Sequence, residues 1–295
     1  MNLKKLKKAL YQRGSKASFV RAAVAVSALS LAWGPLYAQK GFDFGLRGVV
    51  QTTSLINSTD QAAGPELDYQ NYTTMAFGVE AGYSFTNHLG VELNILSSRQ
   101  GQGYKGDPTK VNANSGAIMS SYLLGLASVD NIPVTGNYTG RITTQCIKIP
   151  VLFRYTGNST KKVFFSSFIG PQINLLSSVK FKVNDKEAPF TGFGFKPEDL
   201  YKKTTMDVAF GFGAGFNLSD NLVLSAHMRF DYGLGDIENK SYVTPGSTDK
   251  AWDPARASTH NATGGLMIGL SYKLVKKEKE QPKKGAAPAK KPAGK

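Results

Sequence analysis

Histidine and cysteine are the residues whose chemistry would first indicate an enzyme, and this chain of 295 residues has three histidines and one cysteine. His227 is flanked by Arg229 and Asp231, a setting that favours a structural hydrogen bond over proton transfer. His88 falls in a short turn, where solvent surrounds it. His260 falls in a predicted loop, and a flexible loop does not hold a general base in place. The sequence therefore predicts no catalytic residue, and we expect that the protein is not an enzyme.

The sequence supports a metal or cofactor site no more than it supports a catalytic site. Cys146 is alone, which excludes an intramolecular disulfide, and we expect it to be a small buried side chain. The "GFGAG" stretch at 211–215 lacks the following helix that a phosphate-binding loop requires. Four carboxylates of one predicted loop could offer oxygen ligands to calcium, but we interpret them as surface charges, and we expect no metal and no cofactor. They are Asp236, Glu238, Asp249 and Asp253.

Alternating strands are the elements that must position these residues. In the segment 206–233, "MDVAFGFGAGFNLSDNLVLSAHMRFDYG", apolar residues alternate with polar or small ones on both sides of Ser219 and Asp220. A period of two residues indicates a strand with two different faces. Further segments alternate fully or nearly so, and together with this hairpin they predict eight strands. They lie at 42–51, 75–85, 89–95, 147–155, 162–178 and 266–274.

The connections between the predicted strands are long and short in turn. Long loops are predicted at 55–71, 101–141, 179–203 and 235–261, and short turns at 86–88, 158–161 and 219–220. An up-and-down barrel of an outer membrane has long loops outside the cell and short turns in the periplasm. We therefore predict an all-β fold, an eight-stranded antiparallel up-and-down transmembrane β-barrel. Its four long loops are expected outside the cell and both of its termini in the periplasm.

The apolar face of each predicted strand is expected to contact lipid, and the sheet must close because an open edge is not tolerated in hydrocarbon. Aromatic residues gather near the strand ends that carry the short turns, as in the interfacial girdle of membrane barrels. Tyr72, Phe230 and Tyr232 lie near the opposite rim. The predicted periplasmic aromatic girdle consists of Phe42, Phe44, Tyr83, Phe85, Phe153, Tyr155, Phe164, Phe165, Phe216 and Tyr272.

The other face of each strand carries charged residues and is expected to line the barrel interior. Eight strands enclose a space that side chains can fill, and buried charges are tolerated when they are paired. Counting upward from the turns places opposite charges at matched heights on adjacent strands: Asp43 with Lys273, Arg47 with Glu80, and Glu92 with Arg154. The predicted lumen charge network consists of Asp43, Arg47, Glu80, Glu92, Lys148, Arg154, Asp207, His227, Arg229, Asp231 and Lys273.

Both ends of the chain differ from the predicted barrel domain at 39–275. Residues 1–38 combine basic residues with a short apolar run, which is typical of a signal peptide and too short for a transmembrane helix. Residues 276–295 hold eight lysines among proline and alanine and predict a disordered periplasmic tail. Of the formal net charge of +15, residues 39–275 carry only +2, which argues against a nucleic-acid partner.

Several stretches carry a resemblance to a known family. The chain resembles, over nearly all of 41–275, the PorT-like outer-membrane β-barrel proteins of Bacteroidota, often called a porin family. The resemblance implies no catalytic motif, and it permits a secretion-accessory role, because the member that names the family is linked to protein secretion. The Lys-rich tail and the second long loop go beyond the family pattern. The stretches are "LGVELNILSSRQGQG" (89–103), "IKIPVLFRYTG" (147–157) with "VFFSSFIGPQINLLSS" (163–178), the 206–233 hairpin extended to "DYGLGDI" (231–237), and "GGLMIGLSYKL" (264–274).

Three functions remain open for a protein exported to the outer membrane of a Gram-negative cell. The first is a small non-enzymatic barrel with a structural, adhesive or secretion-accessory role, acting through its external loops or its tail. The second is a narrow porin for passive diffusion of small solutes, which a filled interior disfavours. The third is an outer-membrane enzyme, which the scarcity of acid–base residues disfavours. Expected partners are outer-membrane lipid and, through the tail, a periplasmic protein or cell-wall polymer.

Overall fold

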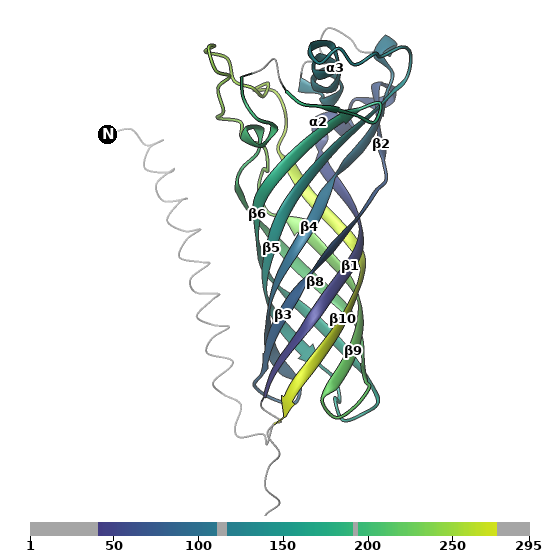
Figure 1. Ribbon diagram of the computed structural model, residues 1–295, viewed down its shortest axis with the longest axis vertical. Coiled ribbons are helices and arrows are strands. Elements are labelled where there is room, and N and C mark those ends of the chain that lie inside the picture. The colour runs from purple at the N-terminus through teal and green to yellow at the C-terminus, as the bar shows by residue number, and fades with distance from the viewer. Residues whose placement is uncertain (1–40, 111–116, 191–193, 276–295) are drawn as a thin grey trace, which may run out of the picture. The chain divides into compact units, whose positions relative to one another are not determined.

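Eight long strands close into a ring in the computed structural model, which describes residues 41–110, 117–190 and 194–275 (Figure 1). Each ring strand pairs antiparallel with its neighbour along the chain, and the last strand pairs with the first. This confirms the predicted barrel; the predicted signal peptide (1–38) and tail (276–295) lie outside the described residues. The ring strands are β1 (Gly41–Asn57), β3 (Tyr72–Ser84), β4 (Leu89–Gly106), β5 (Tyr138–Thr156), β6 (Val163–Val183), β8 (Thr204–Asn217), β9 (Leu222–Gly233) and β10 (Thr259–Val275).

The long connections carry short elements of their own. Two short strands extend the sheet, β2 (Leu67–Gln70) beside β4 and β7 (Lys186–Ala188) beside β6. None of the described helices is long and apolar enough to cross a bilayer. In Figure 1, α2, β2 and α3 gather at one end of the barrel, which we call the loop end, and the opposite end is the turn end. The helical elements are α2 (Ser58–Gln61), η1 (Gly64–Glu66), η2 (Pro108–Lys110), α3 (Met119–Val129) and η4 (Pro197–Leu200).

Short turns join the strands at the turn end, as predicted. Between β3 and β4, the backbone N–H of Phe85 donates to the carbonyl oxygen of Leu89 at 2.9 Å. Between β8 and β9, the N–H of Leu218 donates to the carbonyl oxygen of Leu222 at 2.9 Å. Such local bonds reverse the chain within a few residues and fix the register of the two strands that they join.

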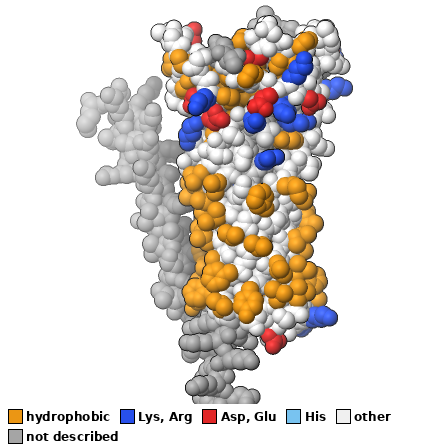
Figure 2. All heavy atoms as spheres, viewed as in Figure 1, with side chains coloured by type: hydrophobic (Ala, Val, Ile, Leu, Met, Phe, Trp, Pro, Cys, Tyr) orange, Lys and Arg blue, Asp and Glu red, His pale blue; other side chains and the backbone are white. Residues whose placement is uncertain are grey.

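The outward faces of the strands form an apolar band around the barrel. On β1, Phe42, Leu46 and Val50 are 49–62% exposed, whereas Asp43 and Arg47 between them are buried. Figure 2 shows hydrophobic side chains over the lower part of the visible face and charged side chains gathered above them. The band covers residues 42–50 of β1, 147–155 of β5 and 266–274 of β10. Its height fits a bilayer, because a tilted strand crosses with roughly 9–11 residues.

The barrel continues beyond this band at the loop end, so the predicted long loops are too long. The predicted loop 101–141 contains the end of β4 and the start of β5, and the predicted loop 179–203 contains the end of β6. On β5 and β6 above the band, outward side chains such as Gln145 are polar, while inward ones such as Ile142 and Phe181 are apolar. This part of the barrel alternates as a soluble sheet does, with its apolar face inside.

A β-bulge in β6 produces the same reversal. Opposite Gln145 and Cys146 the register shifts, which leaves Ser177 of β6 as an extra residue. An extra residue turns the side chains that follow to the other face of the sheet. Leu175 therefore points outward into the band, whereas Val179 is buried inside the barrel, although they are separated by an even number of positions.

A hydrophobic core fills the barrel at the loop end, and we call this region the cap. Inward residues of β5 and β6 pack there against α3 and the long connections. Such a core holds the connections in place by burying their apolar side chains. Its buried members are Leu55, Leu67, Tyr104, Met119, Leu123, Leu126, Ala127, Ile132, Tyr138, Ile142, Val179, Phe181, Val183, Ala188, Phe190, Leu200, Tyr201, Ile237 and Trp252.

Candidate functional site: the barrel interior and the cap

The lower cluster of charges lies inside the barrel near the turn end. Arg47 forms an ion pair with Glu80 on the neighbouring strand, and Nη2 of Arg47 also lies 3.2 Å from Glu92 Oε2. Arg154 Nη1 lies 3.4 Å from the same Glu92 oxygen. The structure thus brings together two of the three predicted pairs, Arg47 with Glu80 and Glu92 with Arg154. Two arginines share one carboxylate, so the cluster is a connected network and not a set of separate pairs.

The third predicted pair, Asp43 with Lys273, is wrong. The two residues are direct neighbours in the register of β1 and β10, but Asp43 is held by Arg154, whose Nη2 lies 2.6 Å from Asp43 Oδ2. Lys273 instead places its Nζ 5.4 Å from the ring centre of Phe164. The reason is the narrow lumen, because a long arginine on β5 reaches β1 across it and offers a two-pronged contact that lysine cannot match.

An apolar layer separates this lower cluster from a second group of charges. On β5, for example, Leu152 lies between Arg154 of the lower cluster and Lys148 of the upper one. Its members are almost fully buried, and packed apolar side chains exclude water from this level of the lumen. They are Val49, Ala76, Leu152, Phe168, Ala209 and Met267.

The upper cluster of charges also spans the lumen. Lys148 Nζ lies 2.6 Å from Asp231 Oδ2, although β5 and β9 are not neighbours in the ring. Arg229 Nε donates to the other oxygen of Asp231 at 2.9 Å. Arg229 Nη2 also donates to Gln172 Oε1 at 2.6 Å, and Gln172 Nε2 donates to Asp207 Oδ2 at 3.1 Å. Charges that sequence analysis assigned to the lumen therefore meet here as a second network.

His227 lies inside the barrel beside Ser166, with its Nε2 at 2.6 Å from the serine Oγ. This is the distance that a nucleophile and its base would need. Both residues are 5% exposed, and Nδ1 of His227 has no hydrogen-bond partner among the described residues. The ring of Phe168 packs edge-on against the imidazole at 5.5 Å. Both side chains are nearly fully buried, so the pair forms part of the packing of the lumen.

A third group of charges is buried inside the cap. Arg256 forms a two-pronged contact with Asp60, Nη1 to Oδ1 at 2.7 Å and Nη2 to Oδ2 at 2.9 Å. Its Nε donates to Glu238 Oε1 at 2.9 Å, and Thr259 donates to the same oxygen at 2.6 Å. Interpreting Glu238 as a surface charge was therefore wrong, because the connection folds inward and leaves this side chain 1% exposed.

Electrostatics in this group favour a charged guanidinium. Burial alone lowers the pKa of Arg256, but the carboxylates of Asp60 and Glu238 outweigh burial and raise it above its ordinary value. Burial raises the pKa of Glu238, although Arg256 acts in the opposite direction. Two carboxylates thus compete for one cation that is always charged, which ties α2, the last long connection and the start of β10 together.

The sequence did not single out the residues that centre the cap. The short segment "NSTD" (57–60) signals a turn, and Asn57 Oδ1 indeed accepts hydrogen bonds from the N–H groups of Thr59 and Asp60. That signal places Asp60 in a structured turn but does not reveal its partner. Arg256 and Trp252 lie in a connection without periodicity, so only the folded structure shows that they are buried.

His260 was expected in a flexible loop, and this expectation was wrong. It lies at the start of β10, where its Nδ1 is 3.0 Å from the carbonyl oxygen of Gly233. Its ring stacks on Tyr232 with 5.9 Å between centres. The strand begins earlier than the sequence predicts, because the pairing with β1 continues up to Asn57. His260 therefore has a fixed structural position on the barrel wall.

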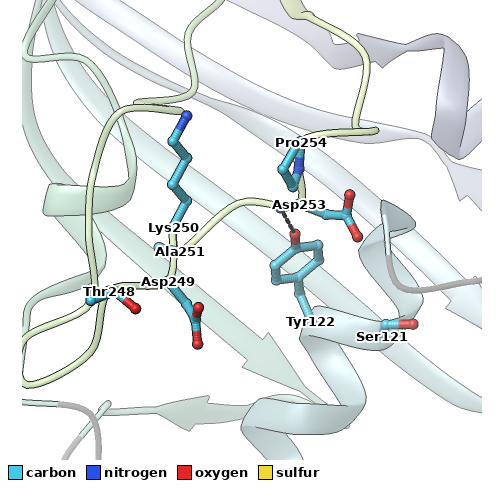
Figure 3. Close-up of a pocket in the computed structure, with 8 residues that line it drawn as sticks. All are labelled: Ser121, Tyr122, Thr248, Asp249, Lys250, Ala251, Asp253 and Pro254. Atoms are coloured by element: carbon cyan, nitrogen blue, oxygen red, sulfur yellow. Dashed lines mark hydrogen bonds between the residues drawn. The ribbon is translucent and has the colours of Figure 1, made fainter.

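An open pocket of about 530 Å³ lies on the cap, between α3 and the last long connection (Figure 3). The hydroxyl of Tyr122 accepts a hydrogen bond from the N–H of Asp253 at 2.7 Å and joins the two sides. Asp249 and Asp253, which sequence analysis considered as calcium ligands, lie on its wall, but no metal-binding group of three His, Cys, Asp or Glu occurs in the described part of the chain. The lining residues are Ser121, Tyr122, Thr248, Asp249, Lys250, Ala251, Asp253 and Pro254.

The predicted aromatic girdle lies at the turn end with one exception. Phe164 is 8% exposed and points into the lumen, whereas Phe165 is 52% exposed and belongs to the apolar band. The sequence left the parity of these two residues open, and the register of β6 with β8 settles it. The outward aromatic side chains contact one another across strands, as Phe42 and Tyr83 do at 4.8 Å. Such rings suit the boundary between hydrocarbon and water.

Known outer-membrane proteins resemble this chain. A family model described as "Outer membrane protein beta-barrel domain" matches residues 37–239. Among solved structures, OprG from Pseudomonas aeruginosa is 15% identical, with a TM-score of 0.37, 82% of this chain and 100% of that chain covered. A major outer membrane protein from Thermus thermophilus is 14% identical, with a TM-score of 0.38 and coverages of 77% and 98%. Ail from Yersinia pestis is 12% identical, with a TM-score of 0.32 and coverages of 78% and 97%. No curated protein matches the chain.

Proposed function

The chain belongs to the outer membrane protein beta-barrel domain family. We propose that it acts in the outer membrane as a closed, non-enzymatic barrel that holds the folded cap outside the cell. One observation carries the proposal: side chains connect opposite walls of the barrel at successive heights. Arg154 reaches Asp43 in the lower cluster, and Lys148 reaches Asp231 in the upper one. Above both, the cap fills the loop end.

Closure follows from the energetic cost of separating these groups. A solute passing through would have to break buried ion pairs at two levels and cross the apolar layer that contains Leu152 and Met267. Removing one partner from a buried pair typically costs about 3–5 kcal/mol. A path that opens both levels is therefore far less favourable than the closed state.

A structured loop end supports a role in binding. Connections that pack on a shared core present a fixed surface, and binding to a fixed surface requires little additional ordering. Trp252 is 1% exposed, and its Nε1 donates to the carbonyl oxygen of Leu200 at 2.8 Å. We propose that this surface serves an adhesive, structural or secretion-accessory role, in keeping with the PorT-like resemblance. The tail at 276–295 is proposed to contact a periplasmic protein or cell-wall polymer.

A narrow porin is the alternative, and the polar lining of the lumen favours it. Buried polar residues face the interior beside the charges: Asn94 donates to Glu92 in the lower cluster, and Thr263 donates to Asp231 in the upper one. A water-filled pore would also need such a lining. The two functions differ in one measurable property, which is steady conductance.

Conductance in a planar bilayer tests the proposal. Purified protein inserted into the bilayer should show no steady channel, and a known porin inserted in parallel provides the positive control. A large, stable conductance in the unmodified protein would overturn the closed barrel and support the porin. The heat-dependent shift in gel mobility confirms that the barrel is folded, and co-flotation of the protein with the vesicles that are fused to the bilayer confirms insertion, so that silence cannot result from failed insertion.

A further inference from the structure

A row of basic side chains borders the apolar band on one half of the barrel. Moving from the band toward the loop end, the first charged outward residue is Arg99 on β4, Arg141 on β5 and Lys180 on β6, and Lys203 lies just before β8. All four are exposed, and β4, β5, β6 and β8 are consecutive in the ring. With Lys182 and Lys202 beside them, we call these residues the basic crescent.

The other half of the barrel differs. Among the described residues, β9, β10, β1 and β3 carry no outward-facing Lys or Arg. Arg47 on β1 and Arg229 on β9 are buried in the lumen clusters. Between the band and the end of β1, the outward residues are uncharged, such as Thr52 and Ser54. The basic side chains are thus concentrated on one side and are not spread evenly around the wall.

The crescent places like charges next to one another. Arg141 and Lys182 are direct partners in the register of β5 and β6, and like charges directly opposite each other destabilise a sheet. Acidic neighbours compensate only in part: Asp185 lies 3.9 Å from Arg141, Glu187 lies 3.0 Å from Lys180, and Asp199 lies 3.8 Å from Lys203. These pairs are largely exposed, so water and salt weaken them.

Three members of the crescent have no such neighbour. Arg99, Lys182 and Lys202 form no ion pair with any described residue. The acids that do pair with crescent members lie farther along the chain from the band than their partners: Asp185 and Glu187 lie beyond the end of β6, and Asp199 lies in η4, before Lys203. The edge that faces the membrane is consequently basic, and an anion from outside the chain would complete it.

We propose that the basic crescent binds phosphate groups of lipid headgroups in the leaflet at the loop end. Continuity with the apolar band favours a lipid as the source of the phosphate. Arg99 lies four residues beyond Ile95, the last exposed apolar residue of β4, which corresponds to about 13 Å along the strand and about 10 Å along the axis of a barrel with tilted strands. Long basic side chains bend back toward the interface. A lipid whose acyl chains lie on the band would therefore place its phosphate against the crescent.

Lipid retention tests this assignment. Full-length protein is reconstituted into phosphatidylcholine vesicles that contain lipid A or dephosphorylated lipid A, extracted with mild detergent, and analysed by native mass spectrometry. The unmodified protein should retain lipid A in preference to the dephosphorylated form. Each basic residue near an anionic surface contributes about fivefold in affinity, so a variant that combines R99Q, R141Q, K180Q and K203Q should lose nearly all of this preference.

A matched variant separates the crescent from overall charge. K105Q, K110Q, K186Q and K250Q remove the same number of positive charges from exposed positions elsewhere at the loop end, and this variant should retain lipid A as the unmodified protein does. Both variants should keep the heat-dependent gel shift of a folded barrel. Equal retention of the two lipids by the unmodified protein, an undiminished preference in the crescent variant, or an equal loss in both variants would each overturn the proposal.

Discussion

At the scale of single residues, reach across the lumen determines which charges pair. Arg154 contacts Glu92 on the adjacent strand at 3.4 Å, and it also reaches across the lumen to Asp43, with Nη1 to Oδ1 at 3.0 Å and Nη2 to Oδ2 at 2.6 Å. Lys273, although next to Asp43 in register, has no ion pair with it in the described structure. A guanidinium held at two points is more strongly bound than a flexible ammonium group, so the cross-lumen pair prevails.

The pair of Asp43 and Arg154 should show strong energetic coupling. Asp43→Asn or Arg154→Gln alone should lower the free energy of unfolding by about 3–5 kcal/mol, because each leaves a buried charge without its partner. The double variant should recover part of this loss, with a coupling free energy of about 1–3 kcal/mol. Recovery is incomplete because Arg154 also contacts Glu92. Urea unfolding in lipid vesicles, followed by gel mobility, measures these values.

As a control, the same set of two single variants and one double variant is made with Lys273 instead of Arg154. Lys273→Gln combined with Asp43→Asn should give a coupling clearly smaller than that with Arg154, since the two side chains are adjacent in register but form no ion pair. Coupling in this cycle as large as that with Arg154 would contradict the assignment of partners.

The backbones of β8 and β9 approach closely at Gly213, which leads to a second prediction for a single residue. A Cβ atom on Gly213 would lie 2.0 Å from the carbonyl oxygen of Ala226 on the neighbouring strand. Gly213→Ala should therefore lower the free energy of unfolding by about 1–3 kcal/mol through overpacking. Gly48→Ala is the control, because no atom lies within 4 Å of the added methyl group. Equal unfolding midpoints of the two variants in urea would refute the steric explanation.

At the scale of elements, the apolar side chains of β6 point outward in the band and inward beyond it. Alternation alone predicted the ring strands correctly because lipid imposes a uniform apolar outward face over the band. The same period continues in Val179 and Phe181, but the bulge at Ser177 has turned these residues inward. Sequence periodicity does not reveal such a switch, and for this reason the end of β6 was predicted as a loop.

The cap is a separate packing unit, and its stability should depend on Trp252. The indole contacts Tyr122 at 4.8 Å between ring centres, and the guanidinium of Arg256 lies 5.2 Å from the centre of the indole. Trp252→Ala should destabilise the cap by about 3–5 kcal/mol. Protease should then cleave the loop end faster, while the band of folded barrel on a gel remains. Val129→Ala, at a 46% exposed position of α3, should leave the cleavage rate unchanged; an identical rate for Trp252→Ala would show that the indole does not hold the cap.

At the scale of the whole molecule, the surroundings of each part decide what the sequence could predict: the band faces lipid, whereas the interior and the cap face other parts of the chain. Lipid selects apolar side chains in a strict period, so the eight ring strands and most of the aromatic girdle were visible in the sequence. The interior and cap depend on contacts between distant segments, such as that of Asp60 with Arg256. These contacts follow from tertiary geometry that no local pattern encodes, which is why Glu238 and His260 were misplaced.

The loop end should face the outside of the cell, because long connections are external and short turns periplasmic in membrane barrels. Single cysteines at Thr248, on the cap, and Asn158, in the β5–β6 turn, are both exposed and test this orientation. Cys146 is only 4% exposed and is first replaced by alanine to remove background reaction. On intact cells, an impermeant thiol reagent should label Thr248→Cys and not Asn158→Cys, whereas permeabilised cells should label both. Labelling of Asn158→Cys alone on intact cells would mean that the barrel has the opposite orientation, and the basic crescent would then face the inner leaflet.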